Sequence, residues 1–306
     1  MAVVVEAEGV TKRWGATLAL DGASFAITSG VTGLLGANGA GKTTMIGMML
    51  GLHRPEAGTV QVLGRDPFRA GAEIRARIGY APEHAALPPD VAAHDVVRHL
   101  AEIHGLPFRA ANARASDALY EVGLGEERFR PVGTMSTGQR QRVKLAQAIV
   151  HDPALVILDE PTVGLDPVQR DQMLALIRHV GHDLGLDVIL SSHLLHEVDR
   201  VCDSVVILDK GRAVESGRLD DLRTSTAAGE LVVEVDGGDD ALATLQRRLE
   251  EGGLTVTVDG SRLAVALPSD DVFDVVRDAL ADTGVGVRRL QRRTRSLEEV
   301  YLGASQ

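Results

Sequence analysis

The stretch Gly36–Thr44, "GANGAGKTT", constrains the fold of this chain most strongly. It lies between two apolar runs, VTGLL before it and MIGMMLGL after it. Glycine is unfavourable inside a helix, so three glycines in nine positions mark a loop with an unusual backbone path. A chance glycine-rich turn before a helix is the alternative. The apolar strand before the loop and the helical run after it make that alternative the weaker one.

The spacing of this loop is that of a phosphate-binding loop. Gly36, Gly41, Lys42 and Thr43 satisfy the pattern G-x-x-x-x-G-K-[ST]. Glycines let successive N–H groups face one anion, and the helix that follows adds its positive end. Lys42 supplies a charge for the outer phosphates, and the Thr43 hydroxyl is placed to ligate Mg²⁺. The residues therefore predict a nucleotide site with Mg²⁺ as a cofactor.

A pair of acids follows a second apolar run. The segment "LVILDE" ends with Asp159 and Glu160, which predicts two carboxylates at the C-terminal edge of a buried strand, where ligands of such sheets bind. One carboxylate can hold Mg²⁺ through its water shell, and the next can orient an attacking water. A strand that simply ends in a polar turn is the alternative. The phosphate loop elsewhere in the chain favours the catalytic interpretation.

Composition limits the function classes. The chain has 306 residues, which suits one large domain or two ordinary ones, and its formal charge of −11 argues against a nucleic-acid binder. The single cysteine, Cys202, excludes an internal disulfide and fits a reducing compartment. No apolar run approaches the roughly 18–20 residues of a membrane span, and we expect no signal peptide.

The order of predicted elements indicates an α/β fold. Near the N-terminus, "VVVEAEGV" and "ASFAI" read as strands, with turns at "TSG" and "DG". Further strands are predicted at 155–162, 187–193 and 204–211, with helical patterns between them. Strands that alternate with helices imply a mostly parallel sheet covered on both faces.

The C-terminal part reads as a separate small unit. The pattern loosens into small and polar residues at 222–229, which predicts a linker. Residues 230–306 then follow the order βαββαβ, which predicts a ferredoxin-like α+β domain. A last helix is expected in "SLEEVYL", residues 296–302. The run "RRLQRRTR" (288–295) could form an anion or lipid patch, but an ion-paired surface is favoured because the tail is rich in acids.

Ser136 begins a further helical segment, "STGQRQRVKLAQAIV". With Gln139 three residues later it fits a capping box. The residues alone leave two interpretations open, an ordinary capped helix and an additional anion site at the helix N-terminus.

Taken in order, these motifs resemble those of the ATP-binding subunit of ABC transporters. The matching segments are Gly36–Thr44, Ser136–Gln139, Leu155–Glu160, Gly164–Pro167 and the residue His193. The resemblance covers roughly residues 3–220. It implies an ATPase with ATP and Mg²⁺, and an ABC cassette over residues 1–221. That cassette would combine a P-loop NTPase sheet with an antiparallel N-terminal β subdomain and a helical subdomain at about 84–150.

The resemblance also implies a head-to-tail homodimer. Each ATP would lie between the phosphate loop of one subunit and the signature helix of the other, and Asp166 would lie in the loop that crosses the interface. Thr137 stands where a glycine is usual in the signature, and Ala37 where a proline is frequent. The nucleotide contacts implied are Trp14, Gly36, Asn38, Gly39, Gly41, Lys42, Thr43, Thr44, Ser136, Gly138, Gln139 and Asp166.

Catalytic roles follow from the same resemblance. Glu160 matches the general base, and His193 matches the residue that senses the γ-phosphate. Glu83 stands where most members have a glutamine that contacts Mg²⁺ and the attacking water. The implied metal ligands are Thr43, Asp159 and Glu83. Trp14 matches an aromatic residue that stacks on adenine, and a buried core tryptophan is the alternative. For His193 taken alone, a surface or capping histidine is the alternative.

The expected partner is an integral-membrane permease, which would be a separate polypeptide. In the family it docks on the region after Glu83, although that stretch could equally be an ordinary helical subdomain packed on its own sheet. The C-terminal unit resembles that of drug-resistance and sodium exporters, which implies efflux of a drug, lipid, ion or similar substrate. Through the expected permease, the resemblance to ABC transporters also implies a location at the cytoplasmic face of the membrane.

Two other classes compete with the exporter. A soluble ABC ATPase that acts on ribosomes or DNA is disfavoured by the single cassette, the lack of a heptad run and the negative charge. A P-loop kinase or nucleotide-binding regulator is disfavoured because it has no use for the Ser136–Gln139 cap.

Overall fold

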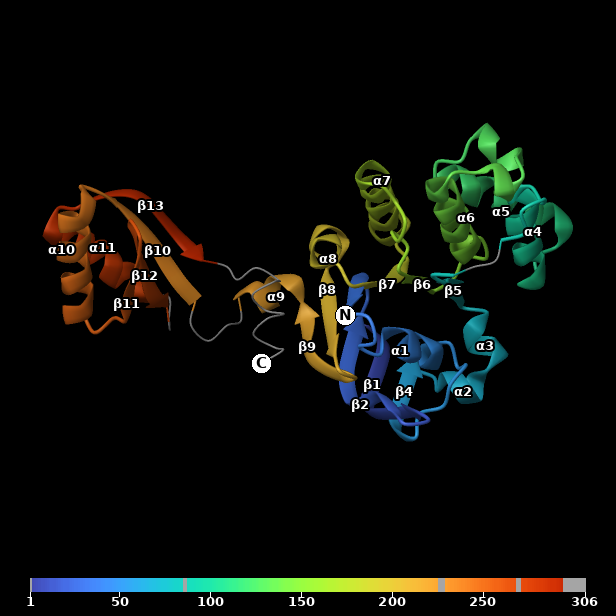
Figure 1. The fold of residues 1–306 in the computed structure, drawn as a ribbon, viewed down its shortest axis with the longest axis horizontal. Coiled ribbons are helices and arrows are strands. Elements are labelled where there is room, and N and C mark those ends of the chain that lie inside the picture. Colours follow the sequence, from blue (N-terminus) through green and yellow to red (C-terminus); the bar gives the residue numbers. More distant parts are fainter. Residues whose placement is uncertain (1, 85–86, 225–228, 268–270, 294–306) are drawn as a thin grey trace. The chain divides into compact units, whose positions relative to one another are not determined.

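The computed structural model describes residues 2–84, 87–224, 229–267 and 271–293. Within it the chain divides into two compact units, the first ending at Leu219 and the second beginning at Asp220. Each unit has its own hydrophobic core, so each is described by itself (Figure 1).

The first unit is built on a six-stranded sheet in the order β5-β6-β7-β3-β8-β9. Neighbouring strands from β5 to β8 pair in parallel, and β9 pairs antiparallel to β8. The strands are β3 (Val31–Leu35), β5 (Ile78–Ala81), β6 (Leu155–Asp159), β7 (Asp187–Ser192), β8 (Ser204–Asp209) and β9 (Arg212–Arg218). The predicted mostly parallel sheet is therefore confirmed.

Strand β6 illustrates why the central strands of this sheet are apolar runs in the sequence. Leu155 and Ile157 belong to one hydrophobic core, whereas Val156 and Leu158 belong to the other. Successive side chains of a strand point to opposite faces. Because both faces of the sheet are covered, every position of β6 is apolar until the strand ends at Asp159.

One face of the sheet packs with α1 against a three-stranded antiparallel sheet of order β2-β1-β4. The elements are β1 (Val3–Trp14), β2 (Thr17–Thr28), β4 (Ala57–Val62) and α1 (Lys42–Met49). The expected turn at Asp21–Gly22 was wrong, because both residues lie inside β2. The pairing with β1 shifts register between Val10 and Lys12, and Gly22 has a φ of 67°. The glycine thus accommodates a bulge in the strand.

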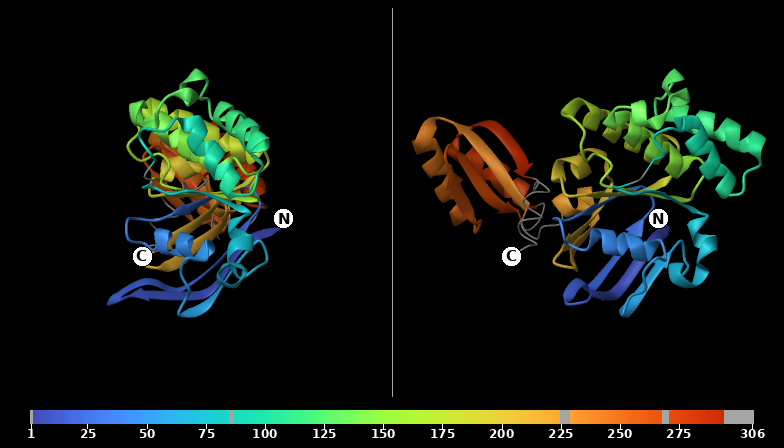
Figure 2. Two further views of the ribbon diagram at one scale, coloured as in Figure 1. Left: turned by 90° about the vertical axis from the view of Figure 1, so that its right-hand side faces the viewer. Right: turned by 45° about the vertical axis from the view of Figure 1, so that its right-hand side comes forward.

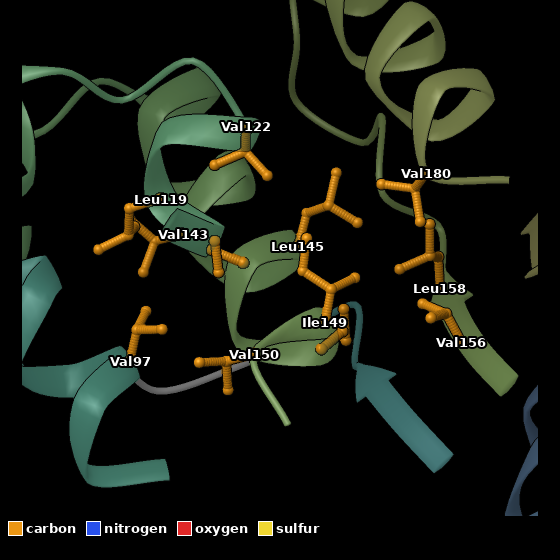
Figure 3. Close-up of a cluster of buried hydrophobic side chains, with 14 of the residues drawn as sticks. Val97, Leu119, Val122, Val143, Leu145, Ile149, Val150, Val156, Leu158 and Val180 are labelled. Atoms are coloured by element: carbon orange, nitrogen blue, oxygen red, sulfur yellow. The ribbon is translucent and has the colours of Figure 1, made fainter. Parts of the chain in front are cut away.

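Helices cover the other face of the sheet. Figure 2 shows α4, α5 and α6 grouped together on one side of the first unit. Figure 3 shows part of their core, where Leu145 and Ile149 of α6 lie near Leu158 of β6. The helices of this unit are α2 (Pro67–Ala70), α3 (Ala72–Arg75), α4 (Ala93–Ile103), α5 (Phe108–Glu121), α6 (Thr137–Ile149), α7 (Pro167–Arg178) and α8 (Leu195–Val201), with 3₁₀ turns at Glu126–Phe129 and Val132–Thr134 and a π turn at His179–Asp183.

The second unit has the ferredoxin-like order that the sequence predicts. Its antiparallel sheet has the order β11-β12-β10-β13, with helices packed on one face through a core that includes Leu231, Leu245 and Leu263. The elements are β10 (Gly229–Asp236), α10 (Gly238–Glu251), β11 (Val256–Asp259), β12 (Arg262–Leu267), α11 (Asp271–Thr283) and β13 (Gly286–Arg293).

The junction between the units differs in detail from the expected linker. Helix α9 spans Leu219–Thr224 and β10 begins at Gly229, so both ends of the stretch 222–229 belong to regular elements. In the arginine-rich run, Arg288 pairs with Asp236, with 2.9 Å between Nη2 and Oδ1. The helix expected at 296–302 lies outside the described residues.

Candidate functional site

The phosphate loop leaves the carboxyl end of β3 and leads into α1, whose first residue is Lys42. Gly41 has a φ of 105°, and a Cβ at this position would lie 2.6 Å from the carbonyl oxygen of Ala19. Only glycine fits this backbone path without a clash. The turn buries Lys42, whose Nζ donates to the carbonyl oxygen of Gly36 at 2.6 Å.

A cavity of about 530 Å³ opens beside this loop. That volume is in the usual range for a small-molecule site, about 300–1,000 Å³. Residues from the loop, from β1 and from the ends of β5, β6 and β7 meet there. Of the residues expected to bind nucleotide or metal, or to act in catalysis, those that line the cavity are Trp14, Asn38, Gly39, Gly41, Lys42, Thr43, Thr44, Glu83, Asp159, Glu160 and His193.

Glu160 lines this cavity and is held from two sides. Its Oε1 lies 3.3 Å from Nζ of Lys42, and its Oε2 lies 2.9 Å from Nδ1 of His193. The residue is 6% exposed and has a φ of 47°, a conformation that costs energy for any residue except glycine. Such strain persists only where the surroundings fix the residue, so the carboxylate is held in a defined position at the end of β6.

Acidic groups dominate the electrostatics of the cavity. Burial raises the pKa of the Asp159 carboxyl, and the charges of Glu83 and Glu160 raise it further, while Lys42 acts in the opposite direction. Burial, together with the charges of Asp159 and Glu83, also raises the pKa of Tyr80 to about 12. A site with this excess of negative charge favours a bound cation.

The donor set suits Mg²⁺. In the described part of the chain, no three His, Cys, Asp or Glu side chains form a metal site by themselves. Mg²⁺ in nucleotide sites is usually bound through one or two carboxylates together with substrate phosphates. The Thr43 hydroxyl and the carboxylates of Asp159 and Glu83 line the cavity and provide only oxygen ligands, which is the chemistry this ion prefers.

Trp14 lines the cavity and presents its ring to solvent. Its side chain is 46% exposed, so the alternative of a buried core tryptophan was wrong. Nζ of Lys12 lies 4.9 Å from the ring centroid, and His53 packs edge-on with a centroid distance of 4.9 Å. Sequence reasoning missed both neighbours. Lys12 could have been found, because residues i and i+2 of a strand share a face, whereas His53 follows from tertiary packing alone.

The predicted capping box at Ser136 is confirmed. The Ser136 hydroxyl accepts a hydrogen bond from the N–H of Gln139 at 3.2 Å, and the Gln139 side-chain oxygen accepts one from the N–H of Ser136 at 3.0 Å. The Thr137 hydroxyl accepts a hydrogen bond from Arg140 at 3.1 Å, so this departure from the signature pattern finds a local partner. Asp166 caps α7 in the same way, accepting from the N–H of Gln169 at 2.8 Å.

The structure does not bring these capped helices to the cavity beside the phosphate loop. The described residues that line the cavity do not include Ser136, Gly138, Gln139 or Asp166. Gly36 is also absent from the lining, although its carbonyl oxygen holds Lys42. One chain thus contains two separate parts of the predicted site, a phosphate-binding half and a signature half.

Comparison with known proteins gives consistent matches. The sequence profile of the family described as ABC transporter matches residues 20–163. The daunorubicin resistance ATP-binding protein DrrA3 of Streptomyces coeruleorubidus is 34% identical over 97% of this chain and 94% of its own length. The linearmycin resistance ATP-binding protein LnrL of Bacillus subtilis is 32% identical over 98% of this chain and 97% of its own length.

Solved structures have the same fold as the first unit. An ATP-binding subunit of an ABC transporter is 29% identical and superposes with a TM-score of 0.63, covering 72% of this chain and 92% of its own. A dimeric ATP-binding cassette in a post-hydrolysis state, bound to ADP and Pi, is 23% identical with a TM-score of 0.63, covering 70% of this chain and 98% of its own. At 23% identity, the match to this second structure shows a shared fold and nothing more.

Proposed function

As a member of the ABC transporter family of ATP-binding subunits, this chain hydrolyses ATP to power a separate membrane permease, and we propose that it does so as one half of a homodimer. The proposal of a homodimer rests on one observation: the predicted site residues lie in two separate places on the chain. Lys42, Glu160 and His193 share one cavity, whereas the Ser136 cap does not line it. The N-terminus of a capped helix is itself an anion site. A two-fold pair would bring this cap to the phosphates bound by the partner subunit.

We propose a role for each group in the cavity. The N–H groups of the phosphate loop and the Lys42 ammonium bind the phosphates. When the ammonium turns to the outer phosphates, the Glu160 oxygen it now contacts at 3.3 Å becomes available to accept a hydrogen bond from water. His193 holds the other oxygen at 2.9 Å and so orients the carboxylate. Trp14 stacks on the adenine ring with its open face.

We propose Mg²⁺ as the cofactor, held by Thr43 and Asp159 with Glu83 beside them. When bound, it neutralises part of the charge on the phosphates and so favours attack by water. Water itself is oriented by Glu160, and the remaining negative charge is met by Lys42.

Mixing two inactive variants tests the shared site. Lys42→Ala removes the phosphate-binding half, and Ser136→Arg blocks the signature half. Each variant alone is expected to lose most of its ATP hydrolysis. A mixed dimer, however, contains one site in which both halves are intact, so mixing should restore hydrolysis, as measured by steady-state phosphate release.

The control for the mixture is the double variant Lys42→Ala/Ser136→Arg, which cannot supply an intact half to either parent. Recovery with that control would contradict the shared site. So would no recovery in the mixture although co-purification of differently tagged chains detects mixed dimers.

We further propose that the partner is the permease of an exporter and that the chain binds it from the cytoplasmic face of the membrane. The named relatives confer resistance to daunorubicin and linearmycin, which supports a drug-like substrate. In the part of the chain that the structure describes, no helix has the length and hydropathy to cross a bilayer.

The turn between α4 and α5 is the proposed permease contact. Ile103 is 64% exposed and Phe108 is 61% exposed on either side of this turn. Ile103→Glu/Phe108→Glu is expected to abolish co-purification with the permease from detergent extracts, while the basal ATPase rate of the isolated chain stays unchanged. Tyr120→Glu, at the far end of α5, is the matched control because Tyr120 is 73% exposed. Co-purification retained by the double variant would place the contact elsewhere.

A further inference from the structure

One buried cation of the first unit is not explained by the role of any motif. Lys144 lies on α6 and is 8% exposed. Among the described residues, no carboxylate lies within 4.0 Å of its ammonium group as an ion-pair partner. Burial lowers the pKa of Lys144, as expected for an ammonium group removed from water. Burial of a charge is unfavourable unless it is compensated by hydrogen bonds or an opposite charge, so its contacts indicate what the residue does.

Those contacts reach the loop that carries Glu83. Nζ of Lys144 donates to the carbonyl oxygen of Glu83 at 2.7 Å and to that of Pro82 at 3.3 Å. This loop leaves the carboxyl end of β5 at Ala81, and the Glu83 side chain lines the nucleotide cavity. The structure gives these two carbonyl groups no other hydrogen bond from a described residue. Lys144 therefore fixes the main chain at the point from which Glu83 enters the site.

The surroundings leave little room for a replacement of this contact by water. The cavity between Lys144, Pro82 and Asp159 holds about 10 Å³, at the lower limit of the roughly 10–15 Å³ that one water needs. The neighbouring residue Leu145 is buried in the core, where it lies near Leu158 of β6 (Figure 3). Helix α6 is thus packed against the sheet at this position.

The N-terminus of α6 carries the Ser136 capping box. Lys144 lies eight residues after Ser136, which is about two turns, or about 12 Å, along a helix. The helix and one side chain thus connect the capping box to Glu83. A shift of the helix at its cap would be transmitted to the Glu83 loop, because packed interiors transmit small displacements.

We propose that Lys144 is a positioning residue, which holds Glu83 in the nucleotide cavity and links its position to that of the signature helix. This inference rests on the role proposed above for Glu83. Lys144 touches neither nucleotide nor water in this scheme, and acts through the loop.

The test compares Lys144→Met with a control on the same helix. Arg142 also donates to two main-chain carbonyls, those of Val122 and Gly123, at 3.3 Å each, but these lie far along the chain from the Glu83 loop. In the full-length chain, Lys144→Met is expected to lower kcat for ATP hydrolysis about 10- to 100-fold, the effect of misplacing a group by about 1 Å. The Kd for ATP, followed through Trp14, the only tryptophan, should stay within about twofold of the wild-type value. Arg142→Met should lower the melting temperature and leave kcat unchanged.

A double-variant cycle separates positioning from general loss of structure. If Lys144 acts through Glu83, then Lys144→Met/Glu83→Ala should be no slower than Glu83→Ala alone. If Lys144→Met does not fold, Lys144→Arg enters the same cycle, since it keeps a donor but changes its reach. Unchanged kcat in the Lys144 variant, or multiplicative effects of the two substitutions, would overturn the proposal. This outcome differs from a failure of the proposed function. If the proposed function were wrong, Glu160→Gln would leave hydrolysis intact, whatever the Lys144 variants do.

Discussion

Glu160→Gln is expected to lower kcat for ATP hydrolysis by about 10²- to 10⁴-fold, the usual contribution of a positioned general base. The amide keeps the shape of the side chain, which is 6% exposed and contacts both Lys42 and His193. It cannot accept the proton of the attacking water. Phosphate release measures kcat, and the fluorescence of Trp14 measures ATP binding, which should be retained.

The same variant reports on assembly. Because bound ATP is hydrolysed only slowly, ATP is expected to hold two Glu160→Gln chains together as a dimer that light scattering detects. Glu234→Gln is a matched control, because Glu234 is also a paired carboxylate, 2.7 Å from Arg262, and lies in the second unit. Wild-type kcat in the Glu160 variant, or a monomer with ATP bound, would refute the mechanism.

Lys42→Met is expected to weaken ATP binding about 10- to 150-fold, since a hydrogen bond to a charged group contributes about 1.5–3 kcal/mol. It should also lower the free energy of unfolding by about 3–5 kcal/mol, the usual result of removing one partner of a buried ion pair. The pair in question is Lys42 and Glu160, whose side chains are 7% and 8% exposed. Titration of Trp14 fluorescence measures the first effect, and denaturant unfolding measures the second.

A double variant distinguishes these two effects of Lys42. In Lys42→Met/Glu160→Gln the buried carboxylate that loses its Lys42 partner is also removed. Stability should therefore recover in part, while ATP binding stays weak. If the single variant binds ATP with the wild-type Kd, the cavity beside the phosphate loop is not the site of the phosphates.

Much of the fold follows from local pattern. The apolar run Leu155–Leu158 predicts a strand buried on both faces, and the order βαββαβ predicts the sheet of the second unit, because burial dictates which positions can be polar. The turn predicted at Asp21–Gly22 failed because a glycine of positive φ serves a β-bulge as well as a turn. The relatives are ATP-binding proteins of resistance and export systems, and none of them supports the ribosome or DNA alternative.

The candidate site, too, is predictable from the sequence only in part. The phosphate loop and the Ser136 cap are recognisable in the sequence because their atoms meet within a few residues of the chain, where covalent geometry decides which groups are neighbours. His193 and Glu160 are 33 residues apart, and Lys144 and Glu83 are 61 residues apart. Their contacts exist because β6, β7 and α6 pack in one particular order. Packing of elements that are distant in the chain depends on how their faces fit, and spacing in the sequence does not contain that information.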